Sequence, residues 1–195
     1  MILLVDMDGT ICEWDNRFDS IGARIHPTLT GRLPLASAAR DFNMFKNLEP
    51  EIHAALLEIF DHPDLYTNLE PIPGAIEAIR EMISEGHHVF FVTSPWYTNE
   101  ACMNEKARWI EHYFGLPGLE RLIITKDKTM VRGDILFDDK PNITGLMEPE
   151  WTQIFYTQGY NKKEKGLRIH SWSEWRGAVN FVSEMRELER KSVLA

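Results

Sequence analysis

The sequence predicts an α/β fold, with a parallel sheet, helices on both faces and a small helical segment inserted after the first strand. The first observation is an alternation of short apolar runs, typical of buried strands, with longer stretches whose apolar residues recur at helical spacing. The apolar runs cover residues 2–5, 88–92, 121–125, 134–137 and 153–156. The second observation is that residues 15–69 contain few strand-like runs. Strands that alternate with helices favour a parallel sheet, because a helix forms each crossover connection.

The composition excludes several classes of protein. The chain of 195 residues is long enough for one core and an insert, and its formal net charge is −9. A nucleic-acid polymer is not an expected partner, because the sequence has no basic stripe to follow a phosphate backbone. No apolar stretch is long enough to span a membrane, and Asp6 ends the first apolar run too early for a secretory signal. Cys12 and Cys102 are too few for a disulfide framework, which favours free thiols and a cytoplasmic protein.

The pattern divides the chain into two units. Residues 1–14 and 70–195 form the predicted catalytic core, and residues 15–69 form the predicted helical cap. Residues 70–74, which include two prolines and end in glycine, read as the linker that returns the chain to the core. The cap therefore lies directly after the first strand in the predicted chain order.

Helices are predicted where apolar residues recur at three- and four-residue spacing. They cover residues 34–39, 50–60, 75–85 and 99–113. Pro50 stands near the start of the second of these helices, a position that proline favours. Ser171 stands three residues ahead of Glu174, which is typical of a capping box at the start of a closing helix.

Polar side chains follow four of the predicted strands at the point where each strand ends. They are Asp6 and Asp8, then Thr93, then Lys126 and Lys128, then Asp138 and Asp139. Because the carboxyl ends of parallel strands share one edge of a sheet, we expect these side chains to gather in one cleft. Phosphoryl transfer needs a nucleophile, charge compensation and a proton for the leaving oxygen, and these residue types can supply all three. Hard oxygen ligands predict Mg²⁺ as the cofactor.

The four strand-end segments read, in order, DMDGT, VTSP, the lysine of KDKT, and FDDKPN. Together they resemble the motifs of the haloacid dehalogenase (HAD) superfamily of phosphohydrolases, which implies a Rossmann-like core. The segments VDMDGT with Trp14, LEPIPGAIEAIREM, VTSPW, EKARWIEHYFG, TKDKT with ILFDDKPNITG, and the late HSW are similar to one branch, the 5'(3')-deoxyribonucleotidases. The sequence departs from that branch at Thr10, where valine is expected.

The resemblance implies a role for each site residue. Asp6 is the expected nucleophile, Asp8 the general acid and base, and Asp6, Asp8 (through its backbone carbonyl) and Asp138 the expected Mg²⁺ ligands. Thr93 and Lys128 complete the catalytic set. The expected substrate-binding residues are Trp14, Thr93, Ser94, Trp96, Lys126 and Lys128. Two roles stay open for Asp139: it binds the metal directly, or it supports the metal site or Lys128.

The implied substrate is a deoxynucleoside monophosphate, and three alternatives are weighed against it. A phosphatase for another small metabolite, such as a sugar phosphate, would use the same core. A catalytically inactive, nucleotide-binding module of this fold is disfavoured, because every expected catalytic group is present. A polynucleotide 3'-phosphatase is disfavoured by the acidic charge. A homodimer is left open as the assembly.

Overall fold

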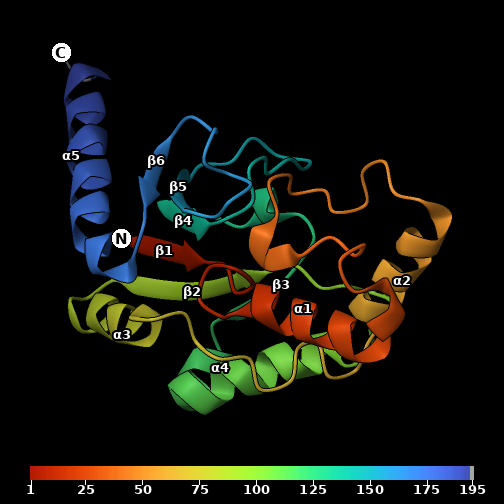
Figure 1. Cartoon of the computed structure of the whole chain (residues 1–195). Coiled ribbons are helices and arrows are strands. Elements are labelled where there is room, and N and C mark those ends of the chain that lie inside the picture. The colour runs from red at the N-terminus through yellow and green to blue at the C-terminus, as the bar shows by residue number, and fades with distance from the viewer. Residues whose placement is uncertain (194–195) are drawn as a thin grey trace.

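A computed structural model describes residues 1–193 of the chain. Its centre is a six-stranded sheet in the order β3-β2-β1-β4-β5-β6 (Figure 1). Every neighbouring pair of strands is parallel, as predicted. The strands are β1 (Ile2–Val5), β2 (His88–Thr93), β3 (Leu122–Ile124), β4 (Ile135–Asp138), β5 (Thr152–Tyr156) and β6 (Leu167–Ile169).

The two faces of the sheet are covered differently. One face packs against α3 (Ala75–Ser84), α4 (Cys102–Leu119) and α5 (Trp175–Val193) in the largest hydrophobic cluster of the described chain. Figure 1 shows α3 and α4 on the same side of the sheet. The other face carries a smaller cluster around Leu4, Leu136 and Trp151, which loop residues complete. The predicted α/β fold with a parallel sheet flanked by helices is thus confirmed, although within residues 1–193 the helices that pack on the sheet lie on one face and not on both.

The segment after β1 forms a second hydrophobic cluster beyond the carboxyl ends of the strands (Figure 1). It contains α1 (Trp14–Ile25), α2 (Pro50–Phe60) and the 3₁₀ helices Pro27–Leu29 and Ala36–Ala38. Its interior is made by apolar residues of both α-helices and of the segment that follows them: Phe18, Ile21, Leu56, Ile59 and Leu65. These helices therefore lie next to the edge of the sheet at which the strands end.

The chain enters and leaves this segment through two short stretches that lie side by side. The Glu13 backbone N–H donates to the Glu70 carbonyl at 2.8 Å, and that of Ile72 donates to the Ile11 carbonyl at 2.9 Å. This pairing fixes where the segment begins and ends relative to the sheet. It supports the predicted division into a core of residues 1–14 and 70–195 and a cap of residues 15–69, which stays a prediction. Residues 194–195 lie outside the described part of the chain.

Two predicted helices of the core and cap are confirmed, since α2 and α3 match the expected segments within one residue. Helix α4 begins at Cys102 and continues to Leu119, past the predicted end. It is kinked at Gly115, whose φ of 67° is open to glycine but strained for other residues.

Two local predictions are wrong, and two elements were not predicted. Residues 34–39 form only the 3₁₀ turn Ala36–Ala38, because a segment of six residues is too short to make up for the cost of helix nucleation. Helix α1 and strand β6 were not predicted. The expected capping box is absent too: the Ser171 hydroxyl lies 2.7 Å from that of Ser173, while Glu174 accepts from the His170 N–H at 3.0 Å.

Among residues 1–193, no helix combines the length and the apolar character that a membrane crossing requires. Both cysteines are free and buried, in agreement with the expectation of free thiols.

Candidate active site

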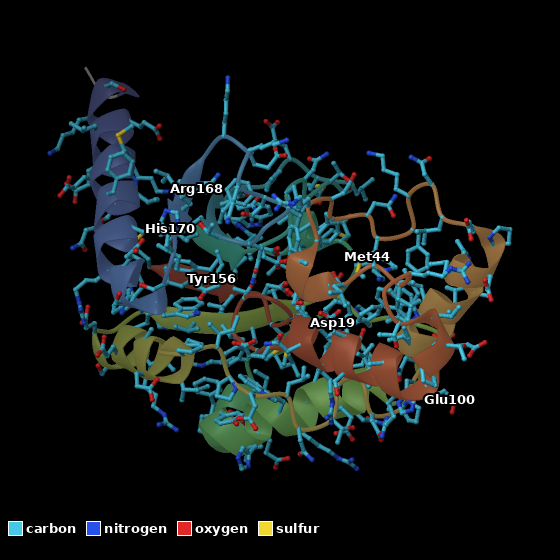
Figure 2. All side chains as sticks on the ribbon, in the orientation of Figure 1. Asp19, Met44, Glu100, Tyr156, Arg168 and His170 are labelled. Atoms are coloured by element: carbon cyan, nitrogen blue, oxygen red, sulfur yellow. The ribbon has the colours of Figure 1, made fainter. Side chains whose placement is uncertain are left out.

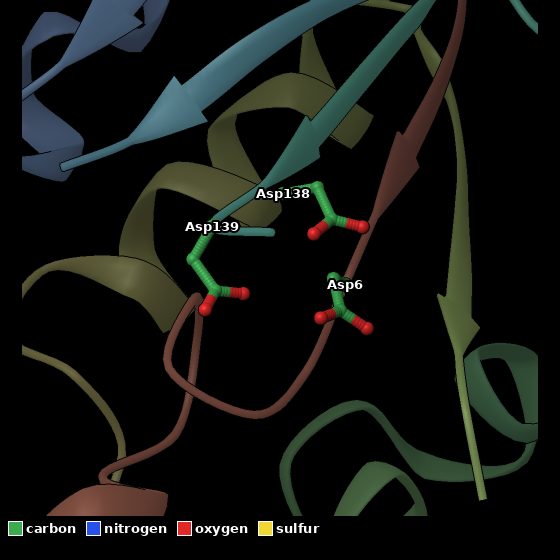
Figure 3. Close-up of side chains that lie close together, drawn as sticks. All are labelled: Asp6, Asp138 and Asp139. Atoms are coloured by element: carbon green, nitrogen blue, oxygen red, sulfur yellow. The ribbon is translucent and has the colours of Figure 1, made fainter. Parts of the chain in front are cut away.

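Three carboxylates meet where β1 and β4 end (Figure 3). Asp6 follows β1 directly, Asp138 is the last residue of β4, and Asp139 comes next. Each offers an oxygen that lies within 4.8 Å of the others, and all three residues are buried. The two strands are hydrogen-bonded neighbours, so the parallel sheet itself brings these acids together.

Lys128 neutralises part of this negative charge. Its ammonium Nζ lies 2.7 Å from Asp6 Oδ1 and 2.6 Å from Asp138 Oδ2. The lysine begins the 3₁₀ turn Lys128–Met130, and the Asp127 carboxylate caps that turn by accepting from the Thr129 N–H at 3.0 Å. Burial disfavours the charged form of Lys128, but the negative charges of Asp138 and Asp6 outweigh the effect of burial and raise the pKa of Lys128. The Lys128 side chain is therefore a fixed cation in the site.

The loop after Asp6 folds tightly around one carbonyl oxygen. The backbone N–H groups of Thr10, Ile11 and Cys12 all approach the Met7 carbonyl, at 3.1, 2.8 and 3.1 Å. Gly9 has a φ of 68°, and a Cβ there would lie 3.1 Å from an oxygen of Asp139. The left-handed backbone conformation favours glycine at this position, and the short distance to Asp139 leaves little room for a side chain.

Asp139 is held from two sides. Thr10 Oγ1 donates to its Oδ1 at 3.1 Å, and the Tyr160 hydroxyl donates to its Oδ2. Thr10 is the position at which the sequence departs from the deoxyribonucleotidase pattern, and its hydroxyl makes a buried hydrogen bond that valine cannot make. Burial and the Asp138 charge raise the pKa of Asp139 well above its usual value.

A second buried lysine, Lys106 of α4, lies behind Asp8. Its Nζ donates to Asp8 Oδ2 at 2.5 Å and to Thr93 Oγ1 at 2.8 Å. The side chain of Lys106 is 1% exposed, whereas that of Asp8 is 26% exposed and reaches the cavity in front. Burial raises the pKa of Asp8, against the lowering effect of Lys106.

The four aspartates and Lys128 line one cavity of about 410 Å³, a size that suits a small organic ligand. Acids and lysines form one wall, and aromatic rings from the cap segment and from the loop after β2 form the other. The rings belong to Trp14, Phe42, Phe45, Phe60, Tyr66 and Trp96. Phe60 and Trp96 are stacked, with ring centroids 4.3 Å apart. Met44, labelled in Figure 2, also lines the cavity.

The cluster suits a divalent cation. Four aspartates line the cavity, while only two buried lysines pair with them, Lys106 with Asp8 and Lys128 with Asp6 and Asp138, so negative charge is in excess. Burial raises the pKa of Asp138 to about 6. Buried carboxylates at such short distances repel one another unless a cation joins them. All the donor atoms are hard oxygens, the ligands that Mg²⁺ prefers. The residues present therefore fit a magnesium ion.

The predicted site residues are gathered in this one cavity. The cavity is lined by Asp6, Asp8, Trp14, Thr93, Ser94, Trp96, Lys126, Lys128 and Asp138. The sequence-based prediction missed Lys106 and Tyr160. A signal existed for Lys106, because it shares the apolar stripe of its helix with Cys102 and Ile110, where a charge is unexpected. Tyr160 lies in an irregular loop and had no such signal.

The sheet, the inserted helical segment and the acidic strand ends define a hydrolase fold of the HAD type. Among solved structures, a HAD family hydrolase from Deinococcus radiodurans is similar with a TM-score of 0.56 and 14% identity, over 93% of this chain and 96% of that chain. A haloacid dehalogenase-like family hydrolase from Xanthomonas campestris is similar with a TM-score of 0.53 and 16% identity, over 95% and 96%. At these identities the likeness concerns the fold alone.

The family model described as 5' nucleotidase, deoxy (pyrimidine), cytosolic type C protein matches residues 1–184, and the chain belongs to this family. The human 5'(3')-deoxyribonucleotidase of cytosolic type is 35% identical, over 89% of this chain and 90% of that protein. The human mitochondrial 5'(3')-deoxyribonucleotidase is 33% identical, over 91% and 82%. The resemblance predicted from the motifs is thereby confirmed.

Proposed function

We propose that this protein is a Mg²⁺-dependent phosphomonoesterase that removes the phosphate from deoxynucleoside monophosphates. One observation carries the proposal: Asp6, Asp8 and Lys128 line the same cavity as the aromatic wall. The family membership and the names of the human relatives support a deoxynucleotide as the substrate.

Asp6 is the proposed nucleophile. Its carboxylate oxygen attacks phosphorus, so that a P–O bond to Asp6 forms while the ester P–O bond breaks. Asp8, two residues on, gives the departing sugar oxygen a proton. In the second step Asp8 takes a proton from water, which attacks the phosphorus, releases inorganic phosphate and restores Asp6.

The phosphate is proposed to lie between Thr93 and Lys128. Thr93 Oγ1 accepts from Lys106, which leaves its own proton free to donate to a phosphoryl oxygen. Lys128 compensates charge on the phosphoryl group. Ser94 donates to the Thr125 carbonyl at 3.1 Å, so it shapes the phosphate loop rather than binding through its hydroxyl proton.

The magnesium ion would be held by Asp6, Asp138 and the backbone carbonyl of Asp8. The position of Asp139 within the same acidic group supports a fourth ligand there, although its bonds to Thr10 and Tyr160 equally suit a supporting role. When bound, the metal supplies positive charge to the phosphoryl oxygens during transfer.

The nucleobase is proposed to stack against the aromatic wall. Trp14 lies 5.6 Å from Phe60, and Phe60 lies 4.3 Å from Trp96, each measured between ring centroids. Lys126 Nζ lies 5.7 Å from the centroid of the Trp96 ring, so a cation stands at the rim of this wall. Flat aromatic faces bind any base by stacking, which leaves base preference to polar groups.

A substrate panel tests the proposal. Deoxynucleoside monophosphates, the matching ribonucleotides and a set of sugar phosphates are compared with and without Mg²⁺. The expected result is hydrolysis that requires Mg²⁺ and favours the deoxynucleotides. A preference for sugar phosphates would instead support a metabolite phosphatase. Nucleotide binding without hydrolysis of any substrate would support an inactive binding module.

Two further assignments belong to this proposal. We place the protein in the cytoplasm, which its two buried free thiols and the cytosolic human relative support, although another human relative is named mitochondrial. A homodimer stays a prediction that gel filtration with light scattering would test.

A further inference from the structure

We infer that Lys106 is a positioning residue that holds the Asp8 carboxylate in place for proton transfer to the leaving oxygen. The inference rests on the proposed function, because it gives Asp8 the role of acid and base. It concerns a residue outside the four strand-end segments, contributed instead by the second turn of α4.

The Lys106 ammonium is fixed in every direction. It donates to Asp8 at 2.5 Å and to Thr93 at 2.8 Å, and it lies 5.2 Å from the centroid of the Tyr66 ring. Its three N–H groups thus face two oxygen acceptors and an aromatic face. A buried lysine is costly unless it is paired in this way, so its place inside the protein needs a reason.

Lys106 acts from behind the site. Asp8, Thr93 and Tyr66 all line the cavity, but Lys106 does not. Its side chain is 1% exposed, so it cannot reach the substrate. Any effect it has on the reaction must pass through the groups that it binds.

Asp8 has no other strong anchor among the described residues. The remaining side-chain contact of its carboxylate is with the Cys12 thiol, a weak donor, at 3.8 Å. Without Lys106 the Asp8 carboxylate is free to rotate toward solvent or toward the other acids. General acid–base catalysis requires the Asp8 carboxyl group to lie within hydrogen-bond distance of the leaving oxygen. Such a rotation would therefore abolish proton transfer from Asp8.

Lys106 and Lys128 therefore pair with different acids of the site. Lys128 binds Asp6 and Asp138, while Lys106 binds Asp8 alone of the acids. The nucleophile and the proton donor each have their own cation, which keeps the two neighbouring carboxylates apart. The positive charge of Lys106 therefore acts on Asp8, the proton donor, and not on the phosphate.

The test compares two leaving groups in one variant. Lys106→Met is assayed with a deoxynucleoside monophosphate, whose sugar oxygen needs a proton, and with p-nitrophenyl phosphate, whose leaving group departs without one. We expect kcat for the nucleotide to fall by about 10²-fold or more, with KM within a few-fold. The first release of nitrophenolate should fall far less. A burst should appear, because hydrolysis of the phosphorylated enzyme still needs Asp8.

A merely structural role would lower kcat for the nucleotide and the rate of the first nitrophenolate release by the same factor. An unchanged ratio between these two rates would therefore overturn the inference. Lys106→Gln is the second variant if Lys106→Met does not fold, and Lys106→Arg should restore part of the ratio. Lys163→Met, at an exposed position, is the control. If the wild-type protein hydrolyses neither substrate, the proposed function fails. If it is active and the ratio does not change, only the assignment of Lys106 fails.

Discussion

At the scale of single residues, the proposed mechanism depends first on Asp6. Its carboxylate lies 2.7 Å from Lys128 and close to two further acids. Asp6→Asn keeps the shape of the side chain and relieves repulsion among the three acids, so the fold should persist. Turnover should fall by about 10⁴-fold or more, because an amide cannot form the covalent intermediate.

Steady-state kinetics and thermal unfolding check this expectation together. Asp64→Asn is the matched control, since Asp64 is a partly exposed aspartate of the cap segment that pairs with Arg24. A folded Asp6→Asn protein with near-normal turnover would refute the covalent mechanism.

Asp15 gives the protein a predicted pH dependence of stability. Burial and the charges of Asp19, Asp8 and Glu13 raise its pKa from 3.8 to about 7, and Tyr160 also lies near it. The folded state thus retains a proton that the unfolded state loses above about pH 4. Stability should fall as pH rises from about 4 to 7, by at most about 4 kcal/mol for a shift of about three units.

Asp15→Asn removes this dependence, because an amide stays neutral. The variant should be more stable than the wild type at pH 8, and the difference should shrink toward pH 4. Urea unfolding at the two pH values measures it. An equal change in the free energy of unfolding at both would show that Asp15 does not titrate in this range.

At the scale of elements, the cap segment is fixed to the core through the C-terminal end of α2. Asp61 Oδ1 accepts from Trp96 Nε1 at 2.8 Å and from the Thr98 hydroxyl at 2.5 Å. Asn99 donates from the loop after β2 to the Phe60 and His62 carbonyls, both at 2.9 Å. These bonds hold the aromatic wall of the cavity next to the carboxyl ends of the strands.

Asp61→Ala removes two of these bonds and frees the Trp96 ring. We expect KM for the nucleotide to rise by about three- to ten-fold, with a loss of stability of about 1–2 kcal/mol. The value of kcat should change little, because no catalytic group moves. Glu58→Ala, on an exposed turn of the same helix, is the control for a change that does not touch the wall.

The elements differ in how far the sequence predicted them. Strand β1 and helices α2 and α3 were predictable because an apolar run or a periodic stripe is a local property. The pattern Trp14, Phe18, Ile21 and Ile25 has helical spacing, but charged residues between those positions masked α1. Strand β6 is three residues long at the edge of the sheet, which is too short for any pattern.

The site was more predictable than the fold around it. Asp6, Thr93 and Asp138 stand at or just after strand ends, and a parallel sheet sends all such ends to one edge. Lys106 and Tyr160 come from a helix and a loop, whose placement depends on packing between distant segments. Sequence periodicity shows that Lys106 shares the apolar stripe of its helix, but it does not show which segments that stripe contacts.

At the scale of the whole molecule, an acidic protein must bind an anionic substrate. The net charge is −9, and four of the acids converge on the catalytic edge of the sheet. Two buried lysines offset only part of that charge. A bound divalent cation would make the site attractive to a phosphate dianion, so metal binding should precede or accompany substrate binding.

Magnesium should therefore stabilise the folded protein, since the acidic group exists only in the folded state. At a concentration of 100 times the dissociation constant, the gain is about 2.7 kcal/mol. For a chain of this size, such a gain raises Tm by roughly 5–10 °C. Differential scanning fluorimetry with MgCl₂, against NaCl of equal ionic strength, measures the rise. Asp138→Asn removes one of the proposed ligands, and this variant should lose most of the rise in Tm. An equal rise in that variant would place the magnesium ion elsewhere on the acidic surface and leave the three carboxylates of β1 and β4 without a metal role.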